Sequence, residues 1–281
     1  MNNLSVNQVS SLKWDFFKDV IQYAKRGFDG IGLWRSKIDD ISIQEAADFL
    51  QEMKMNVTSV GWVGGFTGAE GLSFHQAIDD AIEGIEATAE LRGRCLILHP
   101  GSQSRHTPRH ARRLLDDALR ILVPVAESCG VTLAVEPMVG IEQRQWSMLS
   151  GVMETLAAIE NYSPNQVGMV LDFYHSGADP KLVGNLAKFV DRIQLVQIAD
   201  RRGGINSTES RCLPGCGDLG LQSWIRLLSM SGYTGPIEAE IFGTEVQHLG
   251  YQFVLDASWE YLAYCREIHR SVKSQAQKVT K

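Results

Sequence analysis

The chain lacks the features of a secreted or membrane-spanning protein. No segment approaches the roughly 18 uninterrupted apolar residues of a membrane span, and residues 1–5 lack the basic and apolar regions of a signal peptide. Its 5 cysteines are scattered and odd in number, which argues against a disulfide framework. Cys212 and Cys216 have no second ligand pair for a structural zinc site. We expect a cytoplasmic protein with reduced thiols and no membrane partner.

Excess positive charge is also absent. Lys and Arg total 27 against 33 Asp and Glu, the formal net charge is −6, and no basic arm stands out. We therefore expect no nucleic-acid partner. The 281 residues are 44% hydrophobic, and no linker or low-complexity tract divides them. These features predict a single domain over residues 1–281.

Phosphate-binding glycine motifs are missing as well. No predicted strand is followed by G-x-G-x-x-G or G-x-x-x-x-G-K-[ST], so nucleotide binding at a helix N-terminus has no support. The glycine-rich segment 61–68 has the wrong spacing for either motif. We interpret it as a βα loop and a candidate lid.

What the chain contains is a regular alternation of short Val-, Ile- and Leu-rich runs with longer segments of helical periodicity. This alternation is typical of parallel βα units. The predicted strands are Leu4–Val9, Phe28–Trp34, Val57–Val63, Arg94–His99, Val131–Glu136, Val167–Asp172, Ile193–Ile198 and Ile237–Ile241. The predicted helices are 14–26, 41–53, 74–92, 108–129, 149–161, 180–189, 219–231 and 245–272. Thr107 before Pro108, and Asp218, are the expected caps of two helices. Eight units predict a closed (β/α)8 TIM barrel, an α/β fold, with an open doubly wound sheet as the alternative.

Four predicted strands end in polar groups, although strands buried on both faces should end apolar. The polar positions are Glu136, Asp172, Gln197 and Glu240, with Glu238 two residues before the last. In a parallel barrel the carboxyl ends of the strands converge on one mouth, so these oxygens could meet at one point. Each residue alone could instead cap a helix or pair with a basic neighbour, but several buried like charges repel unless a cation compensates them. We predict one divalent ion, Mn²⁺, Mg²⁺ or Co²⁺ rather than Zn²⁺. Glu238 and Glu240 share a strand face, so spacing alone leaves either as the ligand.

Six segments carry a pattern that spans nearly the whole chain. They are residues 27–33 (GFDGIGL), 98–101 (LHPG), 133–137 (LAVEP), 171–175 (LDFYH), 196–200 (VQIAD) and 232–240 (GYTGPIEAE). The set resembles the xylose-isomerase-like TIM barrel superfamily, which includes sugar isomerases, ketose 3-epimerases, hydroxypyruvate isomerases and keto-inositol dehydratases. Gln197, where many members have His, resembles the hydroxypyruvate isomerase branch, as does Arg211 before the segment 214–218 (PGCGD).

The resemblance implies roles for individual residues. The implied metal ligands are Glu136, Asp172, Gln197 and Glu240, which selects Glu240 over Glu238. Glu136 and Glu240 would also be the catalytic acid and base. Substrate contacts are expected from Trp62, His99, His175 and Arg211, with His99 either facing the pocket or bracing its loop and His175 near the metal. We assign Trp34 to core packing.

The implied chemistry is proton transfer. A metal chelated by a substrate carbonyl and its neighbouring hydroxyl acidifies the carbon between them and stabilises the resulting enediolate. Two carboxylates on opposite sides of the substrate can then move the proton, which gives isomerisation or epimerisation. We expect an isomerase or epimerase that acts on a small sugar or keto-acid, and the resemblance is compatible with a homodimer or tetramer.

Three alternatives remain open at this stage. A keto-inositol or dehydroshikimate-type dehydratase could use the same site to expel a hydroxyl. Apurinic endonucleases share His99-Pro-Gly-Ser and Asp172-x-x-His, but the histidines of a three-zinc cluster are missing here, so DNA repair is a distant alternative. A sugar-binding protein without catalysis is the third, and the predicted acid/base pair argues against it.

Overall fold

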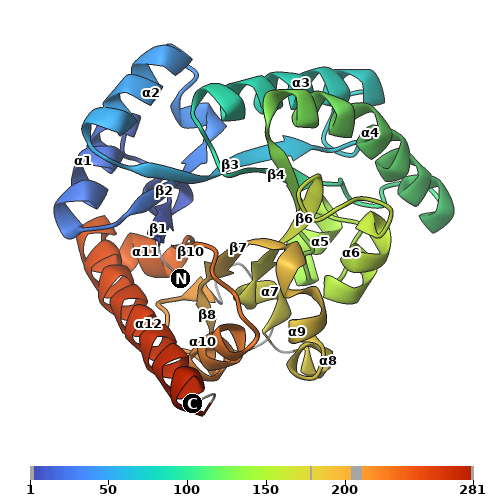
Figure 1. Cartoon of the computed structure of the whole chain (residues 1–281). Coiled ribbons are helices and arrows are strands. Elements are labelled where there is room, and N and C mark those ends of the chain that lie inside the picture. Colours follow the sequence, from blue (N-terminus) through green and yellow to red (C-terminus); the bar gives the residue numbers. More distant parts are fainter. Residues whose placement is uncertain (1–2, 178, 204–210, 280–281) are drawn as a thin grey trace.

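The computed structural model describes residues 3–177, 179–203 and 211–279 and shows a closed barrel of parallel strands inside a layer of helices (Figure 1). The barrel strands are β1 (Leu4–Asn7), β2 (Gly30–Trp34), β3 (Asn56–Gly64), β4 (Cys95–His99), β5 (Thr132–Val135), β6 (Val167–Asp172), β7 (Ile193–Ile198) and β10 (Ile237–Ala239). β1 pairs with both β2 and β10, which closes the ring. The predicted TIM barrel and its eight strands are confirmed.

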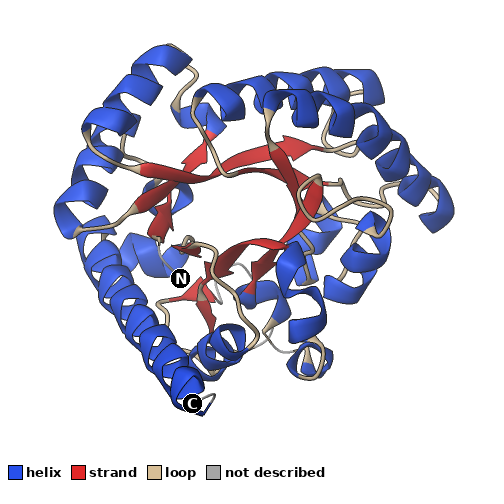
Figure 2. Ribbon diagram, viewed as in Figure 1, coloured by secondary structure: helices blue, strands red, loops and turns tan. Residues whose placement is uncertain are grey.

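Helices cover the outside of the ring of strands, as Figure 2 shows. The longer ones are α1 (Phe16–Arg26), α2 (Ile43–Glu52), α3 (Phe74–Glu90), α4 (Pro108–Cys129), α6 (Val152–Ile159), α10 (Leu221–Met230) and α12 (Tyr251–Val279). Shorter helices are α5 (Gly140–Trp146), α7 (Phe173–Ser176), α8 (Pro180–Val183), α9 (Leu186–Phe189) and α11 (Thr244–Leu249). Short 3-10 turns are η1 (Gln8–Ser11), η2 (Arg35–Lys37) and η3 (Val190–Arg192). Among the described residues, no helix combines the length and apolar character needed to cross a lipid bilayer.

Three predicted helices differ from the structure. The segment 180–189 contains two short helices that separate at Gly184, and the segment 245–272 is interrupted at Gly250, whose φ of 78° breaks the helix. The segment 149–161 becomes helical only after Gly151, and α5, which precedes it, was not predicted.

Thr107 caps α4 as expected, its side chain accepting the backbone N–H of residue 110. The expected cap at Asp218 is wrong, because α10 begins after Gly220 without a side-chain cap.

Several strands end earlier than predicted, which places polar groups at the rim. β1 stops at Asn7, whose side chain accepts the N–H of Val9 and starts η1. Glu136 and Glu240 lie one residue beyond their strands, but their N–H groups still donate to Leu98 and Ile198 at 3.1 Å in each case. The first residues of the glycine-rich segment 61–68 belong to β3 rather than to a loop. Both carboxylates are thus fixed by sheet hydrogen bonds.

A small antiparallel ladder stands outside the barrel. β8 (Asp200–Arg201) pairs with β9 (Arg211–Cys212), with Asp200 opposite Cys212. Between the two strands, residues 204–210 lie outside the described part of the chain. This ladder places Arg211 over the barrel mouth.

Candidate active site

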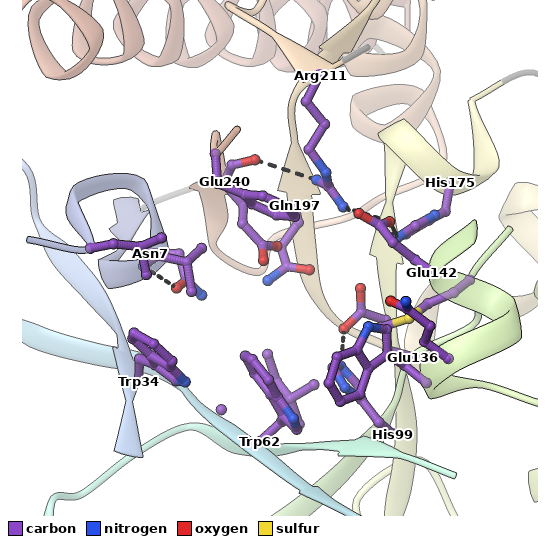
Figure 3. Close-up of a pocket in the computed structure, with 18 of the residues that line it drawn as sticks. Asn7, Trp34, Trp62, His99, Glu136, Glu142, His175, Gln197, Arg211 and Glu240 are labelled. Carbon is purple, nitrogen blue, oxygen red and sulfur yellow. Dashed lines mark hydrogen bonds and ion pairs between the residues drawn. The ribbon is translucent and has the colours of Figure 1, made fainter. Parts of the chain in front are cut away.

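A cavity of about 290 Å³ opens at the mouth formed by the carboxyl ends of the strands (Figure 3). Seven of the eight predicted site residues line it, namely Trp62, His99, Glu136, His175, Gln197, Arg211 and Glu240. Asp172, the eighth, is 1% exposed and contacts Arg211. Residues from distant parts of the sequence thus meet around one cavity at the catalytic end of a TIM barrel.

Glu136 and His99 form a buried pair on adjacent strands. The Nε2 atom of His99 lies 2.9 Å from Oε2 of Glu136, and both residues are buried. The His99 ring stacks on Trp62, with 5.1 Å between centroids and 24° between planes. His99 therefore holds the Glu136 carboxylate and also contacts the aromatic side of the cavity.

Arg211 is the centre of an ion-pair network. Its Nη1 donates to Oδ2 of Asp172 at 3.1 Å, and its Nη2 donates to Oε2 of Glu142 at 3.3 Å. The guanidinium lies 4.0 Å from the ring centroid of Tyr174 and 4.4 Å from that of Phe242. The carboxylates contact the edge of the guanidinium plane, and the aromatic rings contact its faces. The side chain is only 3% exposed, so these contacts hold it in one orientation.

His175 joins the same network. Its Nδ1 accepts the backbone N–H of Val139 at 3.2 Å, and its Nε2 lies 2.9 Å from Oε2 of Glu142. An accepting Nδ1 implies that Nε2 carries the ring proton and donates to Glu142. Oδ2 of Asp172 is 3.7 Å from the same nitrogen. His175, on α7, therefore lies among the charged groups.

The network changes the protonation of its carboxyls. Burial alone would raise the pKa of Glu142, but Arg211 and His175 lower it to about 2. Burial raises the pKa of Asp172 despite the same two neighbours. Burial and the surrounding carboxylates hold the pKa of Glu240 well above its usual range, although Arg211 opposes them. Carboxyls with such different proton affinities in one cavity are a common property of active sites.

Glu238 lies in the layer of side chains beneath the cavity and is hydrogen-bonded to Gln197 in the cavity wall. Glu238 is fully buried and accepts from Asn7 at 2.7 Å, Thr58 at 2.8 Å, Ser59 at 3.0 Å and Gln197 at 3.2 Å. Because the Gln197 amide nitrogen donates to Glu238, the orientation of the amide is fixed. Its Oε1 is buried at the cavity wall without a hydrogen-bond partner among the described residues.

Several of these groups could bind a cation. Donor atoms of Glu136, Asp172 and His175 lie within 4.8 Å of one another. Gln197 and Glu240 line the same cavity outside this cluster, and each has a buried oxygen without a partner in the described chain. Buried oxygens of this kind are rare unless water or a metal satisfies them. The donor set is therefore compatible with a hard divalent cation.

Other residues of the cavity were not found from the sequence. Asn7 ends β1, so the polar strand-end criterion applied to β1 could have identified it. Glu142 and Trp146 lie on α5, a short helix without a periodicity signal. Trp34, which was assigned to the core, lines the cavity instead because it is the last residue of β2.

Comparison with known proteins adds independent information. Residues 20–261 match the family model described as xylose isomerase-like TIM barrel. The chain is 26% identical over 234 residues to 3-dehydro-D-guloside 4-epimerase of Escherichia coli K12, covering 76% of this chain and 82% of that protein. It is 22% identical over 257 residues to inosose isomerase of Halalkalibacterium halodurans, covering 88% and 90%.

A solved structure shares the fold. The crystal structure of IolI protein with a bound zinc atom superposes with a TM-score of 0.80 at 18% identity, covering 97% of this chain and 98% of that chain. At this identity the likeness concerns the fold alone.

Proposed function

The chain belongs to the xylose isomerase-like TIM barrel family, and on this premise we propose that it is a divalent-metal-dependent sugar isomerase or epimerase that transfers a proton through an enediolate. The family and the enzyme class agree with those expected from the sequence, since both curated relatives are named as isomerising or epimerising enzymes. The observation that carries the proposal is the presence of Glu136 and Glu240 in one cavity, each beside further oxygen donors.

We assign the metal to Glu136, Asp172, Gln197 and Glu240. The unpaired buried oxygens of Gln197 and Glu240 support this assignment, because a bound cation would satisfy both. Both oxygens of Asp172 already accept hydrogen bonds, but a carboxylate oxygen has a second lone pair for a further contact. An all-oxygen set favours Mn²⁺, Mg²⁺ or Co²⁺. When bound, such a cation polarises the substrate carbonyl and stabilises negative charge on its oxygen.

The protein side chains then move the proton. Glu240 supplies a proton through the carboxyl oxygen that would not bind the cation. Glu136 accepts the proton of the carbon beside the carbonyl, and His99 at 2.9 Å keeps its carboxylate in place. Arg211, held by Glu142 and Asp172, orients a substrate oxygen. Return of the proton to the neighbouring carbon gives isomerisation, and return to the opposite face gives epimerisation.

Metal content and solvent proton exchange test this proposal together. Wild type loaded with Mn²⁺, Glu240→Gln and the control Glu160→Gln, which changes an exposed glutamate, are analysed by mass spectrometry for bound metal. The same samples are incubated in D₂O with ketoses, inososes and 3-keto-glycosides, and NMR follows deuterium incorporation. We expect about one metal per chain and exchange in wild type and the control, with both reduced at least about tenfold in Glu240→Gln.

Three outcomes would contradict the proposal. Wild type without metal after Mn²⁺ loading would remove the metal-dependent mechanism. Full metal binding and undiminished exchange in Glu240→Gln would remove Glu240 from the site. A product lighter by one water would replace isomerisation with dehydration at the same residues.

A further inference from the structure

Glu238 is a fully buried carboxyl that takes no part in the proposed proton transfer. It lies on β10, directly beside Gln197 of β7 in the register of the sheet. Thr58 and Ser59 of β3 donate to its Oε2 at 2.8 and 3.0 Å. Gly32 of β2 leaves the space that the carboxyl fills, because a Cβ on Gly32 would lie 2.5 Å from Oε2. Four strands of the barrel therefore hold this carboxyl in one place beneath the cavity.

The hydrogen bonds around Oε1 of Glu238 have one possible direction. Oδ1 of Asn7 accepts the backbone N–H of Val9 at 3.1 Å, and Nδ2 of Asn7 donates to Oε1 of Glu238 at 2.7 Å. A backbone N–H can only donate, so the Asn7 amide cannot be reversed without losing this bond. Oε1 of Glu238 is thus an acceptor whether or not the carboxyl is protonated. A proton would lie on Oε2, where two hydroxyl groups can accept a hydrogen bond from it.

The same oxygen decides which end of the Gln197 amide faces the cavity. Figure 3 shows the side chain of Gln197 pointing into the cavity. Its Nε2 lies 3.2 Å from Oε1 of Glu238, and an acceptor at this position requires the NH₂ group of the amide. The amide oxygen is left at the cavity wall, buried and without a partner in the described chain. A cation binds the oxygen of an amide and not its NH₂ group, so a reversed amide would remove one ligand from the site.

We infer that Glu238 is a positioning residue of the metal site, which accepts from both Asn7 and Gln197 through Oε1 and so keeps the Gln197 oxygen toward the cation. This inference rests on the proposed function, since it requires the divalent cation assigned there. The accepting oxygen carries the effect, rather than the negative charge. Glu238→Gln can keep an oxygen toward the two amides while its NH₂ group donates to the hydroxyls, whereas Glu238→Leu has a similar volume and no acceptor.

The affinity of metal-free protein for Mn²⁺ is the quantity that tests this role, measured by isothermal titration calorimetry. The proteins are wild type, Glu238→Gln, Glu238→Leu, Gln197→Ala and the double variant Gln197→Ala/Glu238→Leu. The matched control is Thr58→Val, which removes a hydroxyl donor to Oε2 and leaves the bond between Glu238 and Gln197 intact. Urea unfolding of the same metal-free samples measures the structural cost of each change separately.

Glu238→Leu should raise the Kd for Mn²⁺ about tenfold or more, whereas Glu238→Gln and Thr58→Val should raise it less than about threefold. Gln197→Ala should also raise the Kd about tenfold or more. Adding Glu238→Leu to Gln197→Ala should change the Kd less than about threefold, because the ligand that Glu238 positions is already gone. An unchanged Kd in Glu238→Leu, an equal loss in Glu238→Gln or additive effects in the double variant would overturn the inference.

Wild type provides a second test if Glu238→Leu does not fold. The side-chain NH₂ signal of Gln197 is identified in NMR spectra by its loss in Gln197→Ala. Its exchange with solvent should be at least about tenfold slower than that of Gln51, which is exposed. Equally fast exchange of the two amides would overturn the inference.

Deuterium incorporation into substrate separates this inference from the proposed function. Mn²⁺ binding that is weakened in Glu238→Leu, without deuterium incorporation by wild type, would retain the positioning role and reject the isomerase. Deuterium incorporation by wild type, with an unchanged Kd in Glu238→Leu, would do the reverse. No Mn²⁺ binding by wild type would overturn both.

Discussion

Glu142→Gln tests the ion-pair network with a nearly isosteric change. The variant keeps a side-chain oxygen for the hydrogen bonds of His175 and Arg211 but removes the negative charge. The folded-state pKa of Glu142 is about 2, against an ordinary value of 4.5. A depressed carboxyl pKa stabilises the folded state above pH 4.5, and this contribution is lost as the pH falls toward 2. The difference corresponds to about 3 kcal/mol at pH 7, of which the retained hydrogen bonds recover a part.

Thermal unfolding of the chelator-treated protein measures this contribution. For a chain of this size we expect the melting temperature of Glu142→Gln to lie about 6 °C below that of wild type at pH 7. The difference in unfolding free energy should shrink by about 1 kcal/mol between pH 7 and pH 4, because Glu142 begins to be protonated in the unfolded chain. Glu160→Gln serves as the exposed control and should leave the melting temperature unchanged at both pH values. A destabilisation of the same size at pH 7 and pH 4 would refute the electrostatic reasoning, and no destabilisation at pH 7 would show that Arg211 gains nothing from this partner.

Three further predictions concern the scaffold. Gly64→Ala would place a Cβ 1.8 Å from the His99 carbonyl oxygen, at a residue whose φ is 137°. Urea unfolding should therefore show a loss of unfolding free energy on the order of 3 kcal/mol, or the variant should not fold. The control Gly184→Ala, whose Cβ would have no atom within 4 Å, should be close to neutral. Burial raises the pKa of Asp19 from 3.8 to about 6, so this residue should make wild type lose stability as the pH rises from 4 to 6. Asp19→Asn should make this slope in the melting curves smaller. A wild-type stability that does not change between pH 4 and pH 6 would contradict this prediction. Thr107→Ala removes the N-cap of α4 and should lower the unfolding free energy by about 1 kcal/mol in the same urea assay. An unchanged unfolding free energy would contradict this prediction.

The barrel could be predicted because its strands are buried on both faces. Such strands must be short and almost continuously apolar, and the helices that cover them must be amphipathic. The apolar runs and the helical periodicity are therefore both visible in the sequence. The same logic identified the polar residues of the mouth. Glu136, Gln197 and Glu240 interrupt apolar runs at strand ends, and parallel strands bring these ends together.

The rest of the site depends on segments whose position is set by tertiary contacts. Glu142 lies on a short helix within a loop, where neither periodicity nor motif distinguishes it from a solvated glutamate. Arg211 was expected at the site through the family resemblance and not from a local pattern. It reaches the cavity because β9 pairs with β8, an antiparallel ladder of two residues per strand that is too short to leave a pattern. Trp34 was misassigned because burial and cavity lining demand the same large apolar side chain.

Closure of the ring between β1 and β10 also governs when during synthesis the site can exist. Leu4 of β1 pairs with Ile237 of β10. The backbone hydrogen bonds along this edge of β1 can therefore form only after β10 has been synthesised. Glu240 follows directly after β10 and therefore joins the other carboxylates only at that moment. A nascent chain that stops before Ile237 would expose β1 and β7 as open edges, the part of a sheet most prone to aggregation. Ribosomes that release this protein early would thus yield insoluble fragments rather than partly active enzyme.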